Sequence, residues 1–179
     1  MATERFNKYK DRDEDRVYFK MYADIILPKV KGKVLDLGCG EGWLTKEIAK
    51  MPSVETVIAC DKFSEQPEEN KDEKIEYIKS NINDLNFIGQ FDTIVSTEFI
   101  EHITEEDLNK LLVKITKWLK PDGRFLGSTP NVNQHSGNPY HLREYSVDEL
   151  KAKFSLFNFT GDYSHPIPFL TVFDVWFRS

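Results

Sequence analysis

The feature that most constrains the fold is the alternation of short strand-like runs with helical segments along the chain. Five internal runs have the composition and length of strands, and a sixth closes the chain. They are Lys33–Leu37, Thr56–Cys60, Ile75–Lys79, Thr93–Ser96 and Arg124–Ser128, followed by the tail TVFDVWFRS. Strands that alternate with helices predict an α/β fold with a parallel sheet, because parallel neighbours need a long, usually helical, crossover.

Helical periodicity is clear before and between these runs. The segment Asp13–Leu27 carries apolar residues at helical spacing and is stopped by Pro28. Glu105–Leu119 carries a single apolar stripe, which is typical of a helix that packs on a sheet. Ser146 and Glu149 have the spacing of a capping box and predict the start of another helix.

Length and composition narrow the class of protein. The 179 residues suit a single domain, 1–179, and a formal net charge of -6 argues against a wide grip on nucleic-acid backbone. No apolar stretch reaches the length of a membrane span, and the N-terminal MATERFNKYKDRDEDR is too charged for a signal peptide. Cys39 and Cys60 are expected to be buried thiols in a reducing compartment. The sequence therefore predicts a cytoplasmic globular protein.

Three glycines follow the first expected strand, in VLDLGCGEGW. Gly38, Gly40 and Gly42 would let the backbone approach a ligand closely and aim helix amides at it. Nicotinamide enzymes use a similar turn, but with the spacing G-x-G-x-x-G, and a pyrophosphate would gain nothing from Asp36 inside the strand. A carboxylate there suits a cationic ligand, or else it caps the loop amides as a structural residue. Asp61 closes the second strand, where an acid that holds ribose hydroxyls is expected.

These motifs resemble those of class I S-adenosylmethionine-dependent methyltransferases. VLDLGCGEG looks like the first motif of that family, and Asp61, SNINDL, FDTIVSTEFIEHI and LKPDGRFLGSTPN follow in the family's order between Lys33 and Leu150. The resemblance implies a doubly wound, mainly parallel, Rossmann-like sheet of seven strands with an antiparallel last strand. It also implies S-adenosylmethionine as the cofactor, bound across the carboxyl ends of the first strands.

The same resemblance implies which residues hold the cofactor. Asp36 and the glycine turn would cradle the methionine part, and Asp61 would hold the ribose. Asn81 would stand near the adenine, at a position where many relatives have Asp. The full expected set is Asp36, Gly38, Cys39, Gly40, Gly42, Asp61, Lys62, Asn81, Ile82 and Thr97.

A second group of candidate residues follows the fourth expected strand, in STEFIEHI. Methyl transfer to a hydroxyl requires positioning and removal of the acceptor's proton. His102 is the candidate base because an imidazole titrates near neutral pH; the alternative is a histidine that only bonds the neighbouring loop. Glu98 and Glu101 complete the predicted catalytic set.

The spacing of this group also suggests a metal site. On a helical turn, Glu98, Glu101 and His102 would share one face, and two carboxylates with an imidazole suit Mg²⁺, Mn²⁺ or Zn²⁺. E-x-x-E-H resembles the pattern of ubiquinone-pathway O-methyltransferases, sugar-modifying relatives and small-RNA 2′-O-methyltransferases, some of which bind metal. His135 and His141 are candidates for a fourth ligand. The alternative is that the two acids are favoured by a helix N-terminus.

Two segments are expected to flank the site. The polar stretch 131–145 is long for a connection and is the expected acceptor-site loop. Asn131, His141 and Arg143 are its candidate substrate residues, although Arg143 could equally form a surface ion pair. Residues 1–30 are expected to form a helical lid.

The tyrosines of the lid, Tyr9, Tyr18 and Tyr22, would cover the cofactor, although core packing explains Tyr18 and Tyr22 as well. The apolar PIPFL, residues 166–170, could cover the acceptor site or form a homodimer contact.

The leading hypothesis is a methyltransferase that acts on the hydroxyl of a small molecule, such as a sugar, a lipid-linked compound or a quinone-like compound. An RNA 2′-O-methyltransferase with a metal site is an alternative that the acidic charge disfavours. A nicotinamide oxidoreductase is disfavoured by the glycine spacing and Asp36. A catalytically silent cofactor-binding domain is the remaining alternative, and only turnover separates it from an enzyme.

Overall fold

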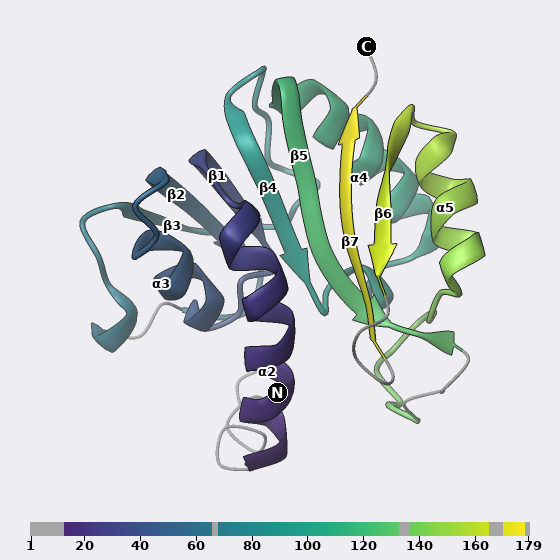
Figure 1. The fold of residues 1–179 in the computed structure, drawn as a ribbon, viewed down its shortest axis with the longest axis horizontal. Coiled ribbons are helices and arrows are strands. Elements are labelled where there is room, and N and C mark those ends of the chain that lie inside the picture. Colours follow the sequence, from purple (N-terminus) through teal and green to yellow (C-terminus); the bar gives the residue numbers. More distant parts are fainter. Residues whose placement is uncertain (1–12, 66–67, 133–136, 165–169, 178–179) are drawn as a thin grey trace.

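The structure is a computed structural model that describes residues 13–65, 68–132, 137–164 and 170–177. Within these residues, seven strands form one sheet in the order β3-β2-β1-β4-β5-β7-β6 (Figure 1). The strands are β1 (Gly32–Leu37), β2 (Val54–Asp61), β3 (Ile75–Lys79), β4 (Phe91–Thr97), β5 (Leu119–Pro130), β6 (Phe159–Ser164) and β7 (Leu170–Phe177). The helices are α2 (Asp13–Ile26), α3 (Trp43–Ala49), α4 (Glu105–Trp118) and α5 (Val147–Ser155), and the short 3₁₀ segments are η1 (Leu27–Lys29), η2 (Glu68–Asn70) and η3 (Ile100–His102).

The strand directions define where a ligand can bind. Strands β1 to β5 run parallel to one another, whereas β7 is antiparallel to both β5 and β6. The prediction of a doubly wound, mainly parallel α/β sheet with an antiparallel last strand is therefore confirmed. The strand order reverses beside β1, because β2 and β3 lie on one side of it and β4 on the other. In such sheets, ligands bind outside the carboxyl ends of the strands at the point of reversal.

Alternate residues of the central strands enter two hydrophobic clusters, one on each face of the sheet. Val34 of β1 joins the cluster that includes residues of α2 and α3, while the adjacent Leu35 joins the cluster that includes residues of α4 and α5. Val95 and Ile94 of β4 divide in the same way. Successive side chains of a strand point to opposite faces, so both helix layers pack on the same strands. Figure 1 shows α2 in front of the sheet and α4 behind it.

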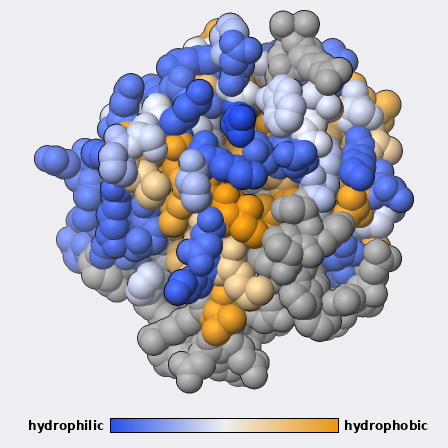
Figure 2. Space-filling model, in the orientation of Figure 1, coloured by the Kyte–Doolittle hydropathy of each residue, from blue (hydrophilic) through white to orange (hydrophobic). Residues whose placement is uncertain are grey.

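The surface in the same view is mixed. An apolar patch lies near the centre of this view, with hydrophilic residues to its left and above it (Figure 2). Ala23 and Ile26 of α2 are buried, so one face of this helix belongs to the core. No helix among the described residues is both long enough and apolar enough to cross a membrane.

Two features of the antiparallel end differ from the sequence-based expectation. β6 was not predicted from its residues, because FTGDYS lacks a strong apolar alternation. The fifth strand was expected to begin at Arg124, but β5 begins at Leu119 and includes KPDG, where Asp122 has a φ of 64° and the pairing with β4 shifts register. Of the residues expected to flank the site, Tyr9, His135 and 166–169 lie outside the described residues, as does the side chain of Tyr18.

Close packing at Gly127 of β5 yields a stability prediction. A Cβ on Gly127 would lie 2.0 Å from the Ser96 carbonyl oxygen and 2.5 Å from the Phe173 ring. We expect Gly127→Ala to lower the free energy of unfolding by about 3 kcal/mol, because β4 or β7 must move to admit the methyl group. Denaturant unfolding measures the loss.

The matched control is Gly89→Ala, where an added Cβ meets nothing within 4 Å and only the φ of 52° opposes it. That variant should lose about 1 kcal/mol. Equal losses in the two variants would contradict the steric explanation.

Candidate active site

The glycine turn joins β1 to α3 and lies between the carboxyl ends of β1 and β2. Gly38, Gly40 and Gly42 have φ values of 70°, 55° and 82°, a region that disfavours residues with a Cβ. A Cβ on Gly38 would also lie 2.3 Å from the Phe99 ring. The Gly38 amide donates to the Cys60 carbonyl oxygen at 2.8 Å, which ties the turn to β2. The predicted close approach of bare backbone to a ligand site is therefore sterically possible here.

Asp36 lies at the end of β1 and is 2% exposed. Its Oδ2 accepts a hydrogen bond from the Thr45 hydroxyl at 2.6 Å, so it bonds a side chain of α3 rather than the loop amides of the structural alternative. Burial, reinforced by the charge of Asp61, raises the pKa of Asp36 from 3.8 to about 6, against the opposing effect of the Thr45 bond. An ionised Asp36 is therefore poorly compensated in the protein alone, and a cationic ligand would compensate it.

Asp61 ends β2 and organises the turn through three backbone amides. Its Oδ1 accepts from the amides of Phe63 at 2.7 Å and Ser64 at 2.8 Å, and its Oδ2 accepts from the Gly40 amide at 3.1 Å. Tyr77 of β3 supports the same turn by donating its hydroxyl to the Gly40 carbonyl oxygen at 2.6 Å. Tyr77 was not predicted as a site residue, because its position is typical of an ordinary strand residue.

The remaining residues of the expected cofactor set lie on this turn or at or just after the carboxyl ends of β2, β3 and β4. Cys39 lies on the turn, and burial raises the pKa of its thiol. Lys62 follows Asp61 with its ammonium nitrogen 5.0 Å from the centre of the Phe63 ring. The set is completed by Asn81, whose Oδ1 accepts from the Asn83 amide at 3.0 Å, by the buried Ile82, and by Thr97 at the end of β4.

Thr97 connects this region to α2. The Tyr22 hydroxyl of α2 is hydrogen-bonded to Thr97, and burial followed by the nearby charges of Glu98 and Asp36 raises its pKa. Tyr22 therefore lies near both Asp36, close to the end of β1, and Glu98, which follows β4.

The prediction that Glu98, Glu101 and His102 share one face of a helical turn is wrong. Glu98 has a φ of 49°, outside any helix, and the helical turn is the 3₁₀ segment η3, which starts only at Ile100. Glu98 Oε1 accepts from the Ser128 hydroxyl at 2.8 Å, and Glu101 Oε2 accepts from the Thr129 hydroxyl at 3.0 Å. The two acids are thus held by β5, and Glu101 is buried at 0% exposure, unlike an exposed acid at a helix start.

Buried negative charge accumulates at this point. Burial, followed by the charge of Glu98, raises the pKa of Glu101 well above its usual range. Burial, together with the charge of Glu144, raises the pKa of Glu98 to about 7. Glu144 itself is 7% exposed and was missed as a site residue, since no local pattern links it to the acids after β4. At neutral pH the Glu101 carboxyl therefore retains its proton unless a cation enters the cluster.

Two histidines lie against the acids. The rings of His102 and His141 are 4.9 Å apart between centroids, and one ligand atom each from Glu101, His102 and His141 lies within 4.8 Å of the others. His102 Nδ1 bonds the Tyr140 carbonyl oxygen at 3.1 Å, and His102 Nε2 is 3.8 Å from Glu101 Oε1. That Oε1 is buried without a hydrogen-bond partner among the described residues.

His141 comes from the acceptor-site loop and is itself held in place. Its Nδ1 is 2.7 Å from Glu144 Oε1, and its Nε2 is 2.9 Å from the Asn138 amide nitrogen. The structure therefore brings His141, one of the two candidates for a fourth ligand, to the group that follows β4. Asn138 competes for the Nε2 lone pair that a cation would take.

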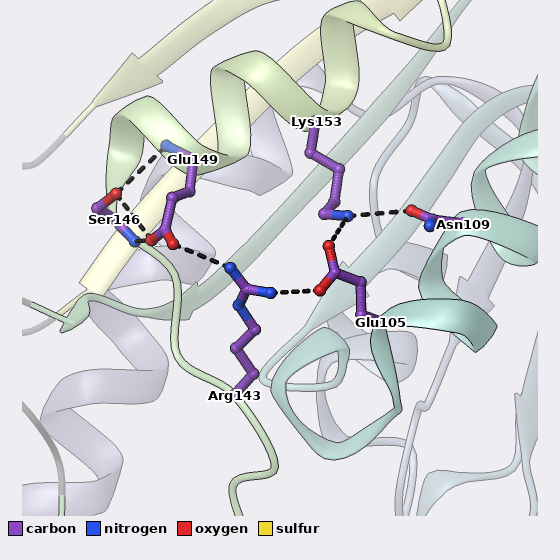
Figure 3. Close-up of polar contacts among 6 residues, drawn as sticks. All are labelled: Glu105, Asn109, Arg143, Ser146, Glu149 and Lys153. Atoms are coloured by element: carbon purple, nitrogen blue, oxygen red, sulfur yellow. Dashed lines mark hydrogen bonds and ion pairs between the residues drawn. The ribbon is translucent and has the colours of Figure 1, made fainter.

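The other two substrate candidates of the loop have protein partners. Asn131 is 8% exposed and donates its amide to the Thr171 hydroxyl at 3.2 Å. Arg143 forms a surface ion pair, with Glu105 and Glu149 as its partners (Figure 3).

The comparison with known proteins agrees with this geometry. A family model described as a methyltransferase domain matches residues 10–161. The chain belongs to the class I methyltransferase family. This methyltransferase domain is 30% identical over 115 residues to the mitochondrial ubiquinone biosynthesis O-methyltransferase of Bos taurus, covering 58% of the chain and 30% of that relative. It is 24% identical over 151 residues to a probable S-adenosylmethionine-dependent methyltransferase of Mycobacterium tuberculosis, covering 78% of the chain and 54% of that relative.

A solved structure shares the fold of this methyltransferase domain across nearly its whole length. The DhpI–SAM–HEP complex superposes with a TM-score of 0.79 at 13% sequence identity, covering 97% of this chain and 92% of the other. The domain thus spans about half or less of the two curated relatives named above, but almost all of the solved DhpI chain.

The burial of Asp36 predicts a gain in stability when its charge is removed. Because the pKa of Asp36 is raised from 3.8 to about 6, the ionised form destabilises the ligand-free protein above that range. Asp36→Asn should therefore raise the free energy of unfolding at pH 8 by about 1–3 kcal/mol. Wild type should lose this stability as the pH rises from about 4 to about 6 and the variant should not, which denaturant unfolding across pH measures.

Asp72→Asn is the matched control, because exposed Asp72 accepts a backbone amide outside the site. It should leave the pH dependence unchanged. A destabilised Asp36→Asn protein at pH 8 would contradict the assignment of uncompensated charge to Asp36.

Proposed function

We propose that this domain transfers a methyl group from S-adenosylmethionine to the hydroxyl of a small, uncharged molecule. The observation that carries the proposal is the proximity of a buried acid on β1 to the acidic group that follows the neighbouring strand β4. Asp36 on β1 lies opposite Val95 on β4, and Glu98 follows the end of that strand. A cationic cofactor beside Asp36 would therefore lie next to the group of Glu98, Glu101 and His102.

The cofactor half of the site is built for a positively charged nucleoside ligand. S-adenosylmethionine supplies an electrophilic methyl group on a sulfonium. Asp36 would balance positive charge near the bare glycine turn, and Asp61 has lone pairs left on Oδ2 for ribose hydroxyls. The contact of Tyr22 with Thr97, between Asp36 and Glu98, supports the expected covering role of the N-terminal segment.

His102 is oriented as a base toward the acceptor side. If Nδ1–H donates to the Tyr140 carbonyl oxygen, the lone pair of the neutral imidazole lies on Nε2. That atom is on the side of the buried Glu101 rather than in the loop. The bond to Tyr140 thus supports both earlier interpretations, since the histidine bonds the loop and is oriented by that bond for proton transfer.

As the alternative to a base at His102, a divalent cation fits the same group, because the one free lone pair cannot both bind an ion and accept a proton. The unpartnered Glu101 Oε1, the clustering of Glu101, His102 and His141, and the nearby Glu98 would together supply oxygen and nitrogen donors. Mg²⁺, or another divalent metal, would lower the proton affinity of a hydroxyl bound to it. The buried acids would hold the ion, and His141 would exchange its Asn138 contact for it.

The charge and rim of the site indicate the class of acceptor. A phosphate or carboxylate on the acceptor would oppose ionisation of these buried acids and would itself be costly to bury, so the site disfavours anionic acceptors and with them the RNA alternative. Tyr140 and Leu142, on either side of His141, are 44% and 62% exposed and present apolar surface at the rim. These features favour an uncharged sugar, lipid-linked compound or quinone-like phenol with some apolar surface. The family match removes the nicotinamide oxidoreductase alternative.

The direct test is transfer of a labelled methyl group to a panel of such hydroxylated acceptors, each beside an analogue that carries a carboxylate. We expect turnover with members of the uncharged group and at least about tenfold lower turnover with the anionic analogues. An increase of about 1.4 kcal/mol in the activation free energy, caused by the unfavourable charge, lowers the rate tenfold. Tight binding of S-adenosylhomocysteine without transfer to any acceptor would instead indicate a non-catalytic binding domain.

Glu101→Gln tests the metal. Replacing this buried carboxylate should weaken Mn²⁺ binding by at least about 100-fold. Loss of a residue that only supports a metal ligand weakens binding by up to about 100-fold, and here a ligand itself is removed. Electron paramagnetic resonance of free Mn²⁺ measures the change. Affinity for S-adenosylhomocysteine should survive.

Glu106→Gln is the control for this experiment, because Glu106 lies on the surface of α4 and pairs with Lys110. It should bind Mn²⁺ as wild type does. Wild-type turnover that is insensitive to chelator would reject the metal while leaving methyl transfer intact.

A further inference from the structure

The acceptor-site loop is tied to two helices by one arginine. The Arg143 guanidinium donates through one nitrogen to Glu105 in the first turn of α4, and through another to Glu149 in the first turn of α5 at 3.0 Å (Figure 3). Its guanidinium carbon also lies 5.1 Å from the centre of the buried Tyr145 ring. A planar guanidinium holds two carboxylates in a fixed fork, whereas the ammonium group of a lysine has no such fixed geometry.

The bridge is part of a larger charged network. Lys153 of α5 donates to Glu105 at 2.8 Å and to Asn109 of α4 at 3.0 Å, so the two helices are also joined directly (Figure 3). Glu149 is held by the Ser146 amide and hydroxyl at the capping box of α5. The Lys153 bond lowers the pKa of Glu105 and the Ser146 bonds lower the pKa of Glu149, so both acids are charged at neutral pH.

Both ends of the bridge are adjacent in the chain to residues of the site. Arg143 lies between Glu144 and the segment that carries His141, and Glu105 follows η3, which carries Glu101 and His102. The amides of Leu142 and Arg143 also donate to the Glu101 carbonyl oxygen at 2.8 Å and 3.3 Å. These backbone bonds tie the loop to η3, and the Arg143 side chain ties it in addition to α4 and α5, so loss of the side-chain bridge would leave His141 less firmly held beside His102.

We propose that Arg143 and Glu105 are positioning residues that hold His141 and Glu144 of the acceptor-site loop against Glu101 and His102. The proposal deepens the proposed function and rests on it in one respect, namely that these four side chains act on the acceptor. The ion pairs are partly exposed, and exposed pairs contribute little to global stability. Their effect should therefore appear in the geometry of the site rather than in the stability of the fold.

The first experiment reads this geometry in the free protein, without cofactor, metal or acceptor. The chain has four histidines, so the imidazole resonances can be assigned by substitution. Ring centroids 4.9 Å apart predict a nuclear Overhauser effect between the ring protons of His102 and His141 in wild type. Arg143→Gln and Glu105→Gln should each weaken it severalfold, and 1 M salt should do the same to wild type, because it screens exposed charges.

Two variants serve as controls. Glu106→Gln removes an acid from the same helical turn, but its partner is Lys110 and not the loop, so the ring contact should remain. Arg143→Lys keeps the charge without the two-pronged geometry and should restore the contact only in part. An unfolding midpoint close to that of wild type in Arg143→Gln shows that the change is local.

The second experiment is kinetic. In Arg143→Gln, kcat should fall by about 10- to 100-fold, the scale for a small misplacement of reacting groups, while the affinity for S-adenosylhomocysteine stays that of wild type. Glu106→Gln should keep both.

The outcomes separate the two proposals. A ring contact that survives in both Arg143→Gln and Glu105→Gln, or is missing from wild type, overturns the positioning role. A contact that is lost in these variants, in a wild-type protein that methylates no acceptor, supports the positioning role and removes the proposed function.

Discussion

Burial of carboxylates at the carboxyl ends of the parallel strands is the constraint on which the rest of the site depends. Asp36, Glu101 and Glu144 are each less than a tenth exposed, and burial raises the pKa of Asp36 and of Glu101. An ionised carboxylate in such surroundings destabilises a protein unless a proton or a cation compensates it. The domain thus has two adjacent places that favour positive charge. Under the proposed function, a sulfonium cofactor occupies one and a metal ion the other.

Neutral hydroxyl groups make this burial tolerable without cancelling the charge. Thr45 of α3 donates to Asp36, while Ser128 and Thr129 of β5 donate to Glu98 and Glu101. A buried lysine or arginine in their place would satisfy each acid permanently and leave nothing for a ligand to compensate. Hydroxyl donors satisfy the hydrogen-bonding requirement of an oxygen and preserve its negative potential. The fold therefore supplies the hydrogen bonds of these acids, and a ligand would supply the compensating positive charge.

The two halves of the proposed site, one for the cofactor and one for the acceptor, differ in how they are assembled. The cofactor half comes from β1, the glycine turn and β2, which are close in sequence and joined by hydrogen bonds such as that of Gly40 to Asp61. The acceptor half combines η3, the end of β5 and the acceptor-site loop. Under the positioning role proposed for Arg143, surface ion pairs contribute to the alignment of this half. A loop held in this way can vary with the acceptor while the cofactor half stays the same.

Local pattern was enough for much of this protein. The alternation of strands and helices was enough to predict a parallel α/β sheet. The glycine spacing and Asp36 were enough to predict a ligand site beside β1. Each of these signals acts over a few neighbouring residues. The same reasoning failed for Glu98, whose φ of 49° takes it off the expected helical face, and for β6, whose residues lack alternation. Only the tertiary structure brought Glu144 and His141 to Glu101 and His102. Such meetings depend on sheet register and on the path of a long loop, which residues far apart in the chain decide together.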